Sequence, residues 1–147
     1  MHNMCKLSLS INVPWRSTSG YSRLTTLDNL AQLYQDQGRY KEAEPLYQRS
    51  LVMKEKVLPP DHPEIANTLG NLALLYYHQG RYEEAEPLCQ HALAIYEKAL
   101  PPDHSYTSIT LKNYARLLRE MNRPLEAQTL EQRAKAIRAR LSSKTPN

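Results

Sequence analysis

The sequence predicts an all-α solenoid of three helix-turn-helix repeats in a right-handed superhelix, and three observations predict it. First, the chain matches itself at an offset of 42 residues, where residues 24–65 and 66–107 are identical at 25 of 42 positions. A weaker third copy begins at Ser108. Second, apolar residues recur at helical spacing within each copy. Third, glycine and proline turn signals fall at matching places. Such a period indicates stacked units that bury their apolar faces against one another.

Each copy divides into two helices joined by a short turn. We expect Asp61 to cap the first helix of the second copy, with Pro63 in its first turn and Glu64 completing a capping box. Gly80 ends that helix, because glycine adopts a left-handed backbone at little cost. The six helices are predicted near residues 24–37, 40–57, 63–79, 82–99, 106–121 and 124–141, with Gly38, Gly80 and Asn122 at the turns.

The predicted organisation is an irregular N-terminal tail (1–19), the repeat array (20–141) and a flexible C-terminal tail (142–147). The array divides at 20–61, 62–103 and 104–141. The last helix carries Glu131 where the earlier copies have Tyr47 and Cys89, and Lys135 and Arg138 where the second copy has Leu93 and Tyr96. Such polar replacements are typical of a terminal capping helix. The first repeat has no such cap. Either the tail folds over it through Ile11, Val13 and Trp15, or the array is the end of a longer one; its exposed face is expected to include Leu24, Leu27 and Tyr34.

Composition argues against most chemical functions. The two cysteines, Cys5 and Cys89, form no CxxC pair, so neither a disulfide framework nor a zinc site is expected. No nucleotide-binding or hydrolase motif is present, and we expect no catalysis, cofactor or metal. No stretch reads as a signal peptide or membrane span, so the expected location is the cytoplasm. Residues 108–147 hold 9 basic and 3 acidic side chains, but nucleic-acid binding would depend on this charge alone and is not expected.

The residues at the repeat positions resemble a known family. Leu69, Leu72-Ala73, Tyr76, Ala85 and Ala92 stand where the tetratricopeptide pattern requires large, small and aromatic side chains. The 42-residue period, with Gly-Arg-Tyr-Glu-Glu-Ala-Glu-Pro-Leu and Asp-His-Pro, resembles the repeats of kinesin light chains and their bacterial relatives. The resemblance covers about residues 20–141 and implies a scaffold that binds a protein or peptide.

The resemblance also implies where a ligand would lie. The first helices of such repeats line a concave groove, and the kinesin-light-chain groove receives extended peptides with acidic residues beside an aromatic one. Here Leu74 and Tyr77 would supply apolar contacts, and the recurring asparagines would bond to the peptide backbone or pack between helices. The candidate peptide-binding residues are Asn29, Gln32, Asn67, Asn71, Leu74, Tyr77, Lys112, Asn113, Arg116 and Arg119.

Two functional hypotheses remain at this stage. The first is an adaptor that binds an extended, acidic peptide in the groove. The second is an assembly module, or the sensor end of a larger regulator, that associates with itself or another domain through the uncapped first repeat. Neither hypothesis involves a membrane.

Overall fold

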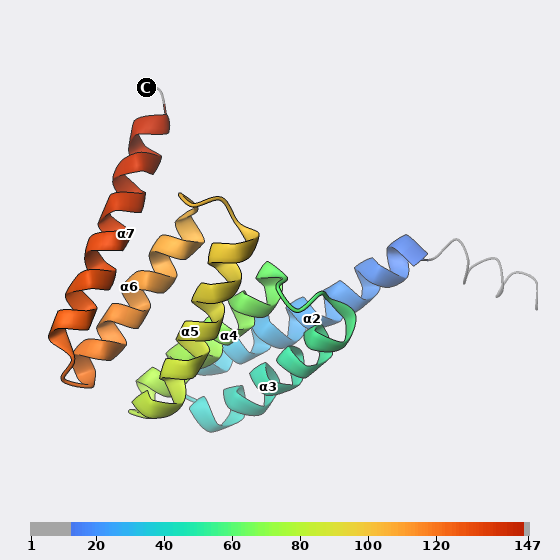
Figure 1. Ribbon diagram of the computed structural model, residues 1–147. Helices are drawn as coiled ribbons and strands as arrows, with labels where there is room; N and C mark the ends of the chain where they lie inside the picture. Colours follow the sequence, from blue (N-terminus) through green and yellow to red (C-terminus); the bar gives the residue numbers. More distant parts are fainter. Residues whose placement is uncertain (1–12, 146–147) are drawn as a thin grey trace, which may run out of the picture.

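The computed structural model describes residues 13–145, with side chains from residue 23 onward, and these residues form six helices and no strand. The helices follow one another as antiparallel hairpins (Figure 1). They are α2 (Val13–Asp36), α3 (Tyr40–Val57), α4 (Pro63–His78), α5 (Tyr82–Ala99), α6 (Ser105–Glu120) and α7 (Pro124–Lys144).

The hairpins stack in chain order. Helix α2 packs on α3, α4 on α5 and α6 on α7, while α4 also packs on α3 and α6 on α5. The first helices of neighbouring repeats meet as well, α2 with α4 and α4 with α6. This arrangement confirms the predicted all-α solenoid of three repeats.

The turns follow the predicted chemistry, with one change at the helix starts. Gly38, Gly80 and Asn122 all have positive φ, of 75°, 73° and 60°, which confirms their position at the end of each first helix. The predicted cap at Asp61 is wrong. His62 caps α4 instead, because its backbone is extended just before Pro63 and its Nδ1 atom accepts a hydrogen bond from the backbone N–H of Glu64.

Two predicted boundaries are corrected by the structure. Helix α2 begins at Val13, so residues 13–19 of the predicted irregular tail are helical, and residues 1–12 lie outside the described residues. Pro14 stands in the first turn, where proline favours a helix start. Helix α7 continues through Lys144, because Ser142 and Ser143 bond back to carbonyls of their own helix and Lys144 reaches Asp103.

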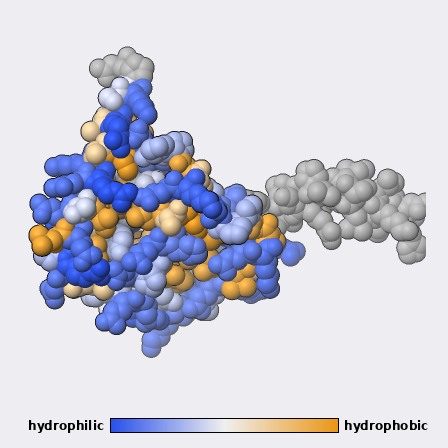
Figure 2. Space-filling view, in the orientation of Figure 1, coloured by the Kyte–Doolittle hydropathy of each residue, from blue (hydrophilic) through white to orange (hydrophobic). Residues whose placement is uncertain are grey.

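The apolar core runs through all three repeats. The largest buried apolar side chains come from α3 to α6, and they include Tyr47, Leu75, Leu111, Leu117 and Leu118. On the surface, the face in Figure 2 shows hydrophobic residues in small groups separated by hydrophilic ones. The core therefore holds each repeat to its neighbour, as a solenoid requires.

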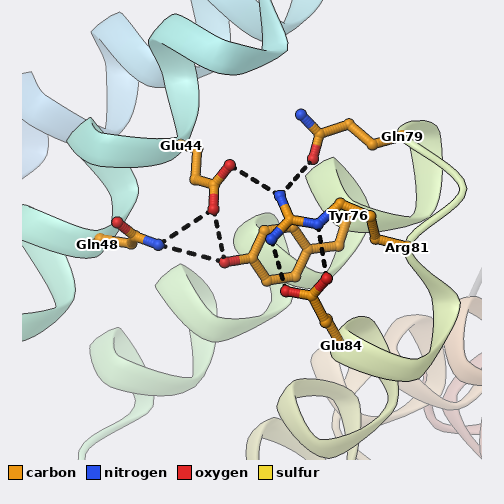
Figure 3. Close-up of polar contacts among 6 residues, drawn as sticks. All are labelled: Glu44, Gln48, Tyr76, Gln79, Arg81 and Glu84. Carbon is orange, nitrogen blue, oxygen red and sulfur yellow. Dashed lines mark hydrogen bonds and ion pairs between the residues drawn. The ribbon is translucent and has the colours of Figure 1, made fainter.

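A polar network joins the first two repeats (Figure 3). Glu44 of α3 accepts hydrogen bonds from the Tyr76 hydroxyl at 3.1 Å and from Arg81 at 2.8 Å, and Gln48, one turn along α3, donates to the same hydroxyl. Arg81 lies over the Tyr76 ring, 4.1 Å from its centroid, and also binds Glu84. One glutamate of a second helix thus holds the turn of the next repeat.

The same network recurs between the second and third repeats. Glu86 and Gln90 of α5 bind the hydroxyl of Tyr114, and Arg123 bridges Glu86 and Glu126. Tyr114 stands one helical turn before the position equivalent to Tyr76, yet its hydroxyl occupies the same place in the network. The pattern Glu-x-x-x-Gln on a second helix therefore marks both junctions.

Candidate functional site

A small open pocket lies between the first helices of the second and third repeats. Helix α4 contributes Leu74 and Tyr77, helix α6 contributes Asn113 and Arg116, and Cys89 of α5 lines it as well. The remaining lining residues are Gly70, Ala73, Thr110 and Leu117. Four of the predicted binding residues, two apolar and two polar, are thus brought together at one junction.

The pocket exists because two side chains are small at this junction. Gly70 stands where the first repeat has Asp28, and Cys89 stands where it has Tyr47. A Cβ added to Gly70 would meet no atom within 4 Å, so the space beside the helix is open. The pocket therefore results from differences between repeats, not from the repeat pattern itself.

The equivalent place between the first and second repeats is filled. The Tyr47 hydroxyl donates to Gln32 and Gln35, each at 3.2 Å, and Gln32 also donates to Asp36. The amide of Gln32, a predicted binding residue, is therefore already engaged within its own repeat. Burial raises the pKa of Tyr47 well above its usual value, which keeps this hydroxyl protonated.

Next to it, a buried ion pair closes the first junction further. The ammonium of Lys54 lies 2.5 Å from Asp28 and 2.7 Å from the hydroxyl of Thr68, and the Lys54 side chain is only 2% exposed. Thr68 also bonds to Asp28, and Glu64 lies 3.6 Å from the ammonium. Asp28 of α2 is thus buried where it meets Lys54 of α3 and Thr68 of α4.

The three basic residues among the predicted binding residues, Arg116, Arg119 and Lys112, differ in whether they already form an ion pair. Arg116 is exposed, lies 5.4 Å above the Tyr77 ring and forms no ion pair with any residue from 23 to 145. Arg119 is different, because its Nε and Nη2 atoms each donate a 2.8 Å hydrogen bond to the carboxylate of Glu131. This pairing lowers the pKa of Glu131. Lys112 lines a separate hollow with Lys135 and Arg138 of α7.

The four predicted asparagines differ in exposure and in whether they line the pocket. Asn71 and Asn113 are half-buried, whereas Asn29 and Asn67 are exposed, and only Asn113 lines the pocket. Sequence reasoning missed Gly70, Thr110 and Cys89 as lining residues. The sequence did hold one signal for this pocket, because the second repeat has the smaller residues Gly70 and Cys89 where the first has Asp28 and Tyr47.

Comparisons with known proteins agree with this architecture. The family profile described as tetratricopeptide repeat matches residues 22–85 and 64–140, which together cover most of the chain. The chain is a tetratricopeptide-repeat protein. Its repeats are of the kinesin-light-chain-like type, and such repeats generally serve as protein-interaction scaffolds. No curated protein sequence matches it at a significant level.

Several solved structures resemble this tetratricopeptide array. BtubC (BKLC) from P. vanneervenii shares the fold, with a TM-score of 0.77 and 24% identity over 97% of this chain and 57% of that chain. A Podospora anserina protein with nearly identical TPR-like repeats of the kinesin-light-chain kind has a TM-score of 0.75 and 29% identity over 85% of this chain and 60% of that one. The TPR domain of Arabidopsis FLU has a TM-score of 0.68 at 16% identity, over 85% of this chain and 99% of that domain. The chain thus spans less than two thirds of the first two proteins.

Within the described residues no group of three or more His, Cys, Asp or Glu side chains is arranged to hold a metal ion. Burial raises the pKa of the Cys89 thiol to about 12, so it stays protonated and is a poor nucleophile at neutral pH. His62 and His104 cap helices. Between residues 13 and 145 no helix is long and apolar enough to cross a membrane.

Proposed function

We propose that this array binds an extended peptide of another protein, with an apolar side chain in the pocket between α4 and α6 and an acidic residue beside it on Arg116. The open pocket carries the proposal. It combines an apolar wall, an amide and an exposed guanidinium within one small site. Pockets that join apolar lining to a few polar groups are typical ligand sites.

Each wall of the pocket has a distinct role in this proposal. Leu74 and Tyr77 are half-buried and offer apolar surface to a side chain of the peptide. The amide of Asn113 can donate to a peptide carbonyl and accept from a peptide N–H, which favours an extended backbone. The cavity volume of about 30 Å³ admits the end of one side chain but not a small-molecule cofactor.

The preference for acidic peptides rests on Arg116. It has no carboxylate partner among residues 23–145, and its guanidinium makes a cation–π contact with the Tyr77 ring. Lys112 extends the positive charge along α6. Arg119 is left out of the proposed contacts, because an incoming carboxylate would have to displace Glu131 from a bidentate pair.

Two neutralising variants on the same helix test the proposal. A fluorescent peptide with one leucine between two aspartates is titrated by anisotropy against the wild type, Arg116→Gln and Arg119→Gln. Both variants remove one positive charge from α6, so long-range attraction falls equally. We expect Arg116→Gln to weaken binding about fivefold or more and Arg119→Gln to change it by less than about twofold.

A lysine-flanked peptide of equal length serves as the ligand control. It should bind at least about tenfold more weakly than the aspartate-flanked peptide at the same ionic strength. Equal losses in the two arginine variants, or equal affinity for the two peptides, would contradict the proposed contact at Arg116.

A further inference from the structure

We propose that the outer face of the first repeat docks an amphipathic helix of another protein, one that presents a glutamate and a glutamine one turn apart. This surface, here called the N-terminal face, comprises Leu30, Leu33, Tyr34, Arg39 and Glu42. It is separate from the groove pocket, and the proposal does not depend on peptide binding there.

The 42-residue equivalence shows that this face is one half of a repeat junction. Leu30 and Leu33 correspond to Leu72 and Leu75, which are 3% and 0% exposed in the core cluster that also holds Tyr47 of the preceding repeat. In the first repeat the same two leucines are 37% and 52% exposed. Leu30 and Leu33 lie where a preceding helix would cover them. Leu24 and Leu27, which the sequence placed on this exposed face, are instead buried and half-buried.

The polar half of the junction is also in place. Arg39 lies over the Tyr34 ring, 4.3 Å from its centroid, and its guanidinium binds Glu42 and Gln37. Arg81 repeats this arrangement on Tyr76, Gln79 and Glu84, and Arg123 repeats the bond to the glutamate three residues on. Both arginines also bind a glutamate from the preceding repeat. No residue between 13 and 145 supplies that glutamate to Arg39.

The two filled junctions define what would complete the third. Their docking helices read Glu44-Pro45-Leu46-Tyr47-Gln48 and Glu86-Pro87-Leu88-Cys89-Gln90, followed by Leu51 or Leu93 one turn later. The glutamate reaches the arginine, the glutamine reaches the tyrosine hydroxyl, and the apolar residues cover the leucines. A helix with this pattern matches the N-terminal face in both charge and shape.

The opposite end of a second copy does not have this chemistry. On α7 the equivalent positions are Gln128 for the glutamate, Glu131 for Tyr47 and Lys135 for Leu51. A copy stacked head to tail would offer Arg39 a neutral amide and would bury charges against Leu30 and Leu33, which is costly. This mismatch favours a helix of another protein over a second copy of this chain as the occupant.

A helix-stapled peptide with the sequence of residues 40–57 is the probe, since an isolated helix of this length is marginal in water. Its binding to the full chain is measured by anisotropy, alongside a peptide with Glu44→Gln and one with Glu44→Arg. We expect the Glu44→Gln peptide to bind about fivefold more weakly. In the chain, Leu33→Asp and Arg39→Glu should each weaken the unmodified peptide about tenfold. The Glu44→Arg peptide should regain most of its affinity with the Arg39→Glu chain.

The controls separate this surface from the groove and from self-association. Arg116→Glu in the pocket should leave peptide affinity within about twofold, and sedimentation should find the chain monomeric at the same concentrations. Absence of saturable binding, equal affinity for the Glu and Gln peptides, or loss of binding in Arg116→Glu would overturn the proposal. So would a dimer that Leu33→Asp dissociates, because the occupant would then be a second copy. Melting curves confirm that each variant is folded.

Discussion

The buried ion pair at the first junction supports a quantitative prediction about stability. Lys54 is 2% exposed and has three oxygen partners, of which Asp28 is the nearest at 2.5 Å and Glu64 is 42% exposed at 3.6 Å. Replacing Asp28 by leucine leaves a buried ammonium with the Thr68 hydroxyl at 2.7 Å and the partly exposed Glu64 carboxylate at 3.6 Å as its remaining oxygen partners. Removing one partner of a buried pair costs about 3–5 kcal/mol in the free energy of unfolding, and we expect Asp28→Leu to lie in this range.

Replacing both partners should cost much less than replacing one. The double variant Asp28→Leu with Lys54→Met leaves no unpaired buried charge, and such replacements are often neutral or stabilising. Lys98→Met is the control, because Lys98 pairs with Asp61 at the same 2.5 Å while 71% exposed, and its loss should cost less than about 1 kcal/mol.

Urea denaturation followed by circular dichroism at 222 nm measures all three variants. We expect Asp28→Leu to be the least stable of the three, with the double variant and Lys98→Met both close to the wild type. A cost below about 1 kcal/mol for Asp28→Leu would refute this expectation, because the pair would then behave like an exposed one. A double variant less stable than the single one would also refute it.

Three further predictions concern stability. Gly70→Ala should stabilise the fold by about 1 kcal/mol and raise the melting temperature by about 3 °C in calorimetry, because alanine favours the helix interior and the added Cβ meets no atom. Asn122→Gly should be about neutral in urea denaturation while Asn122→Val costs about 1–2 kcal/mol, because the backbone there has positive φ. Titration above pH 9 should destabilise the fold, because burial raises the pKa of Cys89 to about 12 and that of Tyr47 higher still. The unfolded chain loses these protons first, so stability is full below the unfolded pKa values and falls as pH rises, and a constant melting temperature from pH 8 to 11 would contradict this.

The fold could be predicted from the sequence because its signals repeat. The helical spacing of apolar residues and the turn residues Gly38, Gly80 and Asn122 recur in each of the three 42-residue copies, so these signals support one another. The helix ends were harder to predict. Val13–Asp36 starts early although Ser, Thr and Gly20 read as loop, since short-range propensity is weak beside the stabilising effect of an existing helix.

The site was less predictable because it depends on differences between repeats. Arg119 and Arg116 look alike in the sequence, and only the position of Glu131 on the facing helix shows that the first is paired. Asp28 and Lys54 are ordinary surface residues by type, and their equivalents in the other repeats carry no matching pair, so nothing periodic indicates their burial. Tertiary contacts between residues far apart in sequence decide these cases.

Filling the pocket at Gly70 is the decisive test of peptide binding between α4 and α6. A leucine at this position would extend into the space that we assign to the peptide's apolar side chain, and its Cβ would meet no atom within 4 Å. The aspartate-flanked peptide is titrated against the wild type, Gly70→Ala and Gly70→Leu, with the melting temperature of each recorded. We expect Gly70→Leu to be at least as stable as the wild type yet to bind the aspartate-flanked peptide at least about tenfold more weakly. The peptide affinity of Gly70→Ala should lie between those of the other two chains. Undiminished affinity in a folded Gly70→Leu chain would show that the peptide binds elsewhere.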